Sequence, residues 1–195
     1  MGGATGTTGT VRTKAVTGML GLSALICAAA GGVHTTETRY YQLDMTPSGK
    51  AQAGLSLEMG RLDVADDLAR REILVQKDAT EIEYYADAQW AVSVPELVRR
   101  KLEAELGRAK ASEPVIVLDG DIQAFQQVDV PGGAEARVTL HLRFRKDFEV
   151  VFQNEYSRQC PARDPSPKAV AHARSRALEA IAADIAADAA KLGND

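Results

Sequence analysis

The chain has 195 residues, 45% of them hydrophobic, and a formal net charge of −4 at pH 7. A chain of this length and composition is long enough to bury one hydrophobic core, so we expect a single domain. Two of the 23 basic residues lie within the first 30 residues, where there is no acidic residue, and the remainder therefore has 21 basic and 27 acidic residues. This acidic balance argues against nucleic acid as a partner, because a polyanion is bound by a basic surface.

Residues 1–30 have the pattern of a secretory signal. Arg12 and Lys14 precede 16 uncharged, largely apolar residues, and this run is shorter than the roughly 20 apolar residues of a membrane-spanning helix. The pattern predicts an exported protein. We expect residues 31–37 to form a polar tether and residues 38–195 to form the domain.

Two ways of processing this leader are open. Cys27 can become the lipid-modified first residue of a bacterial lipoprotein, or an ordinary peptidase can cut after the small residues Ala28, Ala29 and Ala30. Ile26, which precedes the cysteine, is bulkier than the residue usually found there.

Short apolar runs predict four strands in the first half of the domain, at about residues 40–43, 55–62, 73–75 and 82–85. An amphipathic helix is predicted after the only tryptophan, Trp90. Apolar residues recur every four positions from Val94 to Leu106, and Pro95 lies in the first turn, where proline costs little. We expect the charged residues of this helix on its solvent-exposed face: Arg99, Arg100, Lys101, Glu103 and Glu105.

The second half of the domain contains the clearest strand of the sequence. From Ala136 to Arg145 apolar and polar residues alternate strictly, which is typical of an antiparallel strand with one solvated face. A preceding strand begins at Val115, and its break in alternation predicts a β-bulge near residues 119–120 or Ala124. A hairpin turn is expected at residues 131–133.

The remainder of the domain is predicted to be a strand, a loop and a long helix. The strand covers residues 148–156, and the loop, which includes Cys160, covers 157–167. Ser166 can cap a helix that begins at Pro167 and runs to about Leu192. The fold class is therefore α/β (α+β): a single domain with a mixed, largely antiparallel sheet of about six to seven strands, packed by two main helices.

The sequence contains no pattern typical of an enzyme or a metal site. His34, His141 and His172 do not lie at ligand spacing with one another or with a cysteine. Cys160 has no evident base beside it, so an inert thiol is favoured over a nucleophile. We expect no catalytic residue, no cofactor and no metal.

Six residues are candidates for contact with a partner or a lipid. Trp90 follows a strand that contains Tyr84 and Tyr85, and it belongs either to the core or to a ligand platform. Arg137, Arg143 and Arg145 lie on the polar face of the alternating strand and either face solvent or meet acidic groups.

Taken together, these features resemble the ABC-type transport auxiliary lipoprotein family, which includes the paraquat-inducible lipoprotein C and lipoproteins that accompany MCE-domain transporters. The resemblance covers nearly everything after residue 37. Its most specific part is the pair Trp90–Ala91, which follows a tyrosine-containing strand and precedes an amphipathic helix. The motif at residues 120–125, the strand at 138–144 and the alanine-rich last helix continue it.

The resemblance implies that the protein is not an enzyme but an accessory component of a transport system. It implies a lipid on Cys27 and a periplasmic location in a Gram-negative cell, anchored to the outer membrane or, alternatively, to the inner membrane. It also implies phospholipids or related lipids as cargo. The implied partners are an MCE-domain protein and, through it, a permease and an ATPase. Repeated copies of the chain are expected, since MCE partners are ring-like. The alternative is a soluble periplasmic domain that binds a hydrophobic ligand beside Trp90.

Overall fold

The computed structural model describes residues 37–50, 56–107 and 115–192. The predicted leader, with Cys27, lies outside these residues. Residues 36–195 form one compact unit. Its elements are β1 (Arg39–Tyr41), β2 (Ser56–Val64), β3 (Glu72–Gln76), β4 (Ile82–Trp90), α1 (Val94–Leu106), β5 (Val115–Val130), β6 (Gly133–Lys146), β7 (Glu149–Pro161) and α2 (Pro167–Leu192).

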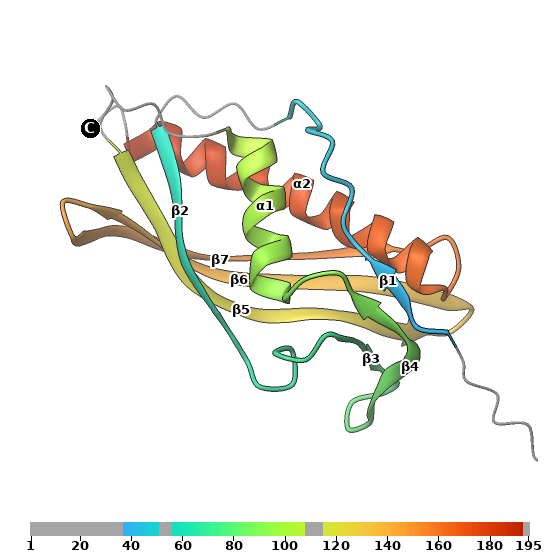
Figure 1. Ribbon diagram of the computed structural model, residues 1–195. Coiled ribbons are helices and arrows are strands. Elements are labelled where there is room, and N and C mark those ends of the chain that lie inside the picture. The colour runs from blue at the N-terminus through green and yellow to red at the C-terminus, as the bar shows by residue number, and fades with distance from the viewer. Residues whose placement is uncertain (1–36, 51–55, 108–114, 193–195) are drawn as a thin grey trace, which may run out of the picture. The chain divides into compact units, whose positions relative to one another are not determined.

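The strands form one mixed sheet in the order β1-β4-β3-β5-β6-β7, with β2 paired to β5 (Figure 1). The pairs β3–β4, β5–β6 and β6–β7 are antiparallel, whereas β1–β4, β2–β5 and β3–β5 are parallel. Both helices lie on the same side of this sheet (Figure 1). The predicted fold class is therefore confirmed.

Strand β5 is the strand on which the sheet is assembled. It pairs with β6 from Val117 to Val130 on one side, and with β2 and then β3 on the other. Its register shifts between Ile122 and Ala124, which confirms the predicted bulge at its second expected position. Gly120 permits the close approach to β6, because a Cβ atom there would lie 2.0 Å from the His141 carbonyl oxygen.

The hydrophobic core lies between the sheet and the two helices. The apolar residues of β6 face it and are fully buried, as their alternation predicts: Ala136, Val138, Leu140, Leu142 and Phe144. Helix α2 contributes a buried stripe that includes Val170, Leu178, Ile181 and Ile185. The predicted cap of this helix is confirmed, since the Ser166 hydroxyl accepts a hydrogen bond from the Ala169 amide at 3.2 Å.

The predicted loop 157–167 is partly wrong, because β7 continues to Pro161. Cys160 pairs with Ala136 inside the ladder rather than lying in a loop. Strand β7 is an edge strand, and most of its side chains are exposed. Its polar residues therefore give no hydrophobic alternation from which the end of the strand could be predicted.

The predicted exposed face of α1 is wrong for Lys101 and Glu105, whose side chains are fully buried. The Lys101 ammonium lies 2.7 Å from Glu105 and 3.3 Å from Glu179 of α2, and it donates to the Thr46 carbonyl at 3.0 Å. Ser48 donates to Glu105 through its amide and its hydroxyl. This buried cluster joins α1, α2 and the segment after β1.

The cluster keeps Glu105 ionised. Burial opposes the charged form, but the hydrogen bonds from Lys101 and Ser48 outweigh burial and lower the pKa of this carboxyl. A buried ion pair contributes little net stability while it is intact, but removal of one partner leaves the other charge unpaired in the interior.

We therefore expect Lys101→Met to lower the free energy of unfolding by about 3 kcal/mol, because it strands the Glu105 carboxylate. Equilibrium urea unfolding measures the change. Arg100→Met is the control, since Arg100 pairs with Glu96 on the same helix but is half exposed; we expect it to cost less than about 1 kcal/mol. Equal losses in the two variants would contradict the role of the buried cluster.

Candidate functional site

The first candidate region is a cavity of about 260 Å³ beside the β3–β4 hairpin. Tyr84 and Tyr85 line it, as do Lys77, Glu83, Gln127, Asp129, Val75 and Pro165. The Tyr85 hydroxyl lies within hydrogen-bond distance of the Gln127 side chain and the Pro165 carbonyl, and the Tyr84 hydroxyl donates to the Asp67 carbonyl. Lys77 and Asp129 form an ion pair at 2.6 Å across this cavity. This cavity is lined by both charged and apolar groups.

Trp90 does not line this cavity. Its side chain is 1% exposed and lies in the core, where its ring is 5.5 Å from the ring of Phe125. Of the three aromatic residues considered as contacts, Tyr84 and Tyr85 therefore share one cavity, and Trp90 belongs to the interior. A deep apolar groove formed by all three is not found among the described residues.

Sequence analysis missed the most unusual group near this region, which is Arg174 of α2. Its side chain is fully buried between the rings of Trp90 and Phe125, at 5.0 and 5.2 Å. Nη2 lies 3.5 Å from the Leu74 carbonyl, and Nε and Nη1 have no hydrogen-bond partner among the described residues. Burial lowers the pKa of Arg174 to about 9, so the group is still charged at neutral pH. A signal was present, because Arg174 lies midway between Val170 and Leu178 on the apolar stripe of the helix.

The energetic balance at Arg174 is unfavourable. A desolvated cation–π contact contributes about 2 kcal/mol, whereas burial of an ion costs several kcal/mol even after relaxation. The two aromatic rings therefore offset only part of the cost. The domain retains a buried charge that its core packing does not require.

We expect Arg174→Met to raise the free energy of unfolding by about 1 to 2 kcal/mol at pH 7, because an apolar side chain replaces an unpaired buried charge. This gain should shrink as the pH rises through about 9, where Arg174 of the folded wild type loses its proton while the unfolded chain keeps it. Urea titrations at pH 7 to 10 measure both effects. Arg176→Met, at an exposed position of the same helix, should change stability by less than about 0.5 kcal/mol. A clear loss of stability in Arg174→Met would show that the guanidinium is favourably paired.

The second candidate region is the sheet face opposite the helices, where the three predicted arginines lie. The Asp119 carboxylate accepts hydrogen bonds from Arg143 Nε at 2.8 Å and from Arg145 Nη1 at 3.1 Å. Arg137 donates to the Gln76 side chain at 3.1 Å. Two of the arginines thus share one carboxylate, and their side chains remain about 40% exposed. The face is fixed in geometry and accessible to a partner.

The third candidate region is the β6–β7 hairpin tip, defined here as residues 147–151. Asp147 and Phe148 have φ values of +49° and +71°, which is the signature of a tight type I′ turn that normally selects asparagine and glycine. Phe148 is 91% exposed, and Val150 and Val151 are about half exposed. A bulky residue in the left-handed region is strained, so neither burial nor backbone preference explains phenylalanine at this position.

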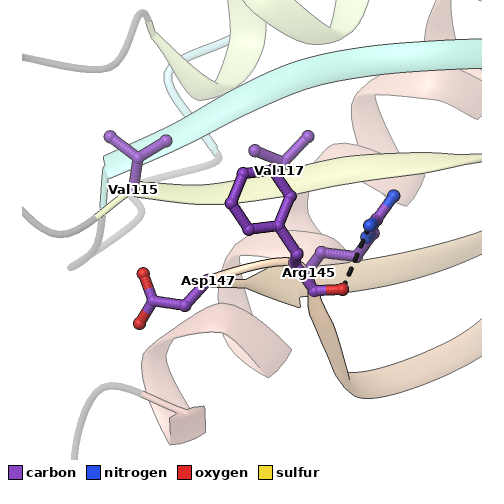
Figure 2. A pocket seen from close by; sticks show the side chains of 5 residues that line it. Val115, Val117, Arg145 and Asp147 are labelled. Atoms are coloured by element: carbon purple, nitrogen blue, oxygen red, sulfur yellow. Dashed lines mark hydrogen bonds between the residues drawn. The ribbon is translucent and has the colours of Figure 1, made fainter.

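The hairpin tip and one predicted arginine border the same cavity, which has a volume of about 310 Å³. Figure 2 shows Val115 and Val117 of β5 beside Arg145 and Asp147 of the hairpin. Arg145 Nη2 donates to the Phe148 carbonyl at 3.0 Å, which holds the turn against the strand. The lining combines apolar side chains with one cation and one carboxylate, a composition suited to contact with another molecule.

Within the described residues, no group of three or more histidine, cysteine, aspartate or glutamate side chains is arranged to hold a metal ion. Neither α1 nor α2 is long and apolar enough to cross a membrane.

A family model for the ABC-type transport auxiliary lipoprotein component matches residues 41–186. The chain belongs to this family, which is a family of transport components and not of enzymes. Membership confirms the predicted resemblance and associates the protein with an ABC transport system and, as a lipoprotein component, with export and a membrane.

Two solved structures are similar to this one. A Xanthomonas campestris protein assigned to the DUF330 family has a TM-score of 0.64 and 17% sequence identity, over 80% of this chain and 96% of that one. An uncharacterized protein has a TM-score of 0.58 and 13% identity, over 80% and 97% of the two chains. This domain accounts for almost the whole of both solved chains. Among curated proteins, none matches the sequence.

Proposed function

We propose that this protein is a lipid-anchored, periplasm-facing accessory component of an ABC-type system that moves phospholipids or related lipids between membranes. In this proposal an MCE-domain protein binds the domain and connects it to the permease and the ATPase. The observation that carries the proposal is the family match over residues 41–186. The positively charged and then apolar N-terminal segment supports export.

The anchor in this proposal is an acylated Cys27, most simply in the outer membrane. Several acyl chains are needed for durable attachment, since a single chain binds a bilayer only reversibly. The alternative, a soluble domain that binds a hydrophobic ligand, has less support, because Trp90 is buried and the cavity at Tyr84 and Tyr85 is lined by Lys77 and Asp129.

We expect mass spectrometry of the mature protein to find a triacylated Cys27 at the N-terminus, and Cys27→Ser to release the protein from the membrane fraction. A free N-terminus near residue 31 would instead show that an ordinary peptidase processes the leader. That result would contradict the proposed lipid anchor but not the proposed MCE-domain partner.

Docking on the MCE-domain protein is assigned to the outer sheet face and the hairpin tip. This choice rests on the exposed Phe148, on the cavity that it shares with Arg145, and on the geometry of Arg143 and Arg145 around Asp119. An exposed aromatic anchor beside an arginine has the composition of a binding hot spot.

We expect Phe148→Gly to weaken capture of the MCE-domain protein at least tenfold, because truncation of a hot-spot residue costs about 2 kcal/mol or more. The same change should keep or raise the stability of the domain, since glycine tolerates positive φ. Binding of purified full chains is measured by biolayer interferometry. Ile82→Gly is the control, because Ile82 is half exposed on the other hairpin. Unchanged capture by Phe148→Gly would exclude the tip as the docking site.

A further inference from the structure

The start of α2 carries a basic surface that the proposed docking site does not use. A cavity of about 380 Å³ is lined there by Arg163, Lys168, His172 and Arg176, together with Asp164, Ser166 and Ala169. Lys168, His172 and Arg176 are spaced four residues apart, so they share one face of the helix. All four basic side chains are exposed. We call these four residues the α2 basic surface.

The α2 basic surface carries more positive than negative charge. No carboxylate among the described residues forms an ion pair with Arg163, Lys168 or Arg176, although ion pairs are numerous elsewhere in the domain. Within the part of the chain that the structure describes, Arg176 donates to the Pro161 carbonyl. Asp164 is the one acidic residue that lines the cavity. Hydrogen bonds from Ser166 and the nearby charge of Arg163 lower its pKa, so it offsets part of the positive charge. The surface thus has a net positive charge on a protein that is acidic overall.

Helix stability does not account for this arrangement. The start of a helix has a partial positive charge and is stabilised by acidic side chains, yet the first turn of α2 has none. Lys168 instead lies in the first turn, where the helix dipole disfavours a cation. The acidic residues of α2 lie further along the helix, at Glu179, Asp184 and Asp188. This distribution of charge along α2, with basic residues first and acidic residues later, favours the binding of an external anion at the start of the helix.

The position of the α2 basic surface in the domain indicates which kind of anion it binds. The described chain enters the domain through β1, which packs beside the first half of α2, where the Asp44 amide donates to the Ser175 hydroxyl at 2.9 Å. Cys27 precedes Glu37 by ten residues, which reach about 35 Å at most. In a chain anchored at Cys27, this end of the domain is therefore held near the membrane, whereas the hairpin tip lies at the opposite end of β6 and β7 (Figure 1).

We infer that the α2 basic surface binds the phosphate groups of anionic membrane lipids and so holds the domain with the start of α2 toward the bilayer and the hairpin tip away from it. The inference rests on the proposed function for the presence of an anchor. The contact is electrostatic, because the cavity is lined by charged and polar side chains and no large apolar side chain is available there to enter the hydrocarbon region.

Flotation of residues 37–195 with lipid vesicles tests the inference, because these residues belong to one compact unit with its own hydrophobic core and carry neither the leader nor an acyl chain. We expect binding to vesicles that contain 40% phosphatidylglycerol, little binding to pure phosphatidylcholine, and release at 300 mM salt. The triple variant R163Q/K168Q/R176Q should lower the partition coefficient about 100-fold, since each basic residue near an anionic surface contributes roughly a fivefold factor.

The matched control is R61Q/R100Q/K146Q, which removes three exposed cations elsewhere and changes the net charge equally. It should retain most of the binding. Equal losses in both triple variants, or equal binding to both kinds of vesicle, would overturn the inference. Displacement by millimolar glycerol phosphate would also overturn it, because the site would then bind a soluble phosphate rather than a membrane. The assay contains no partner protein, so its failure is distinct from a failure to capture the MCE-domain protein.

Discussion

The pairing of β5 with β6 is the constraint on which the rest of the domain depends. The two strands pair from Val117 to Val130, and every other element is placed by contact with this ribbon or with its neighbours. Strands β2 and β3 use successive parts of the free edge of β5, β7 uses the free edge of β6, and α2 covers the apolar side of β6 and β7. Gly120 permits this ribbon to form at its closest point, so the sequence requirement at that position comes from the β6 backbone.

Much of this fold was predictable from local patterns. The strict alternation of β6 and the stripe of α2 specify which face of each element is buried, and the bulge near Ala124 follows from the break in phase of β5. Local patterns could not show that other parts of the chain pack against the polar side of α1. Lys101 and Glu105 are buried because Glu179 and the segment at Ser48 close over them, and both groups come from distant parts of the sequence.

The candidate site was predicted only in part, for a related reason. Tyr84, Tyr85 and the three arginines were identified from periodicity, which places a residue on a face but does not specify its partners. Asp119 binds two of these arginines because β5 and β6 pair in one register, and this register depends on the bulge. Phe148 lacked any sequence signal, since the pair Asp147–Phe148 is not a typical turn pair. Arg174 was detectable, because a charged residue in an apolar stripe is either paired or functional.

The two ends of the domain differ in chemistry, and the long ribbon keeps them apart. One end presents several arginine and lysine side chains beside a single carboxylate, and the other presents an exposed phenylalanine and valines in a strained turn. A 14-residue strand such as β6 spans about 45 Å, so a domain that stands with one end on a membrane holds the other end well away from it. Contact of one end with lipid therefore leaves the other free for protein. A bilayer offers anions without a fixed shape and is suited to the basic end, whereas a rigid aromatic side chain on a tight turn is suited to a shaped protein pocket.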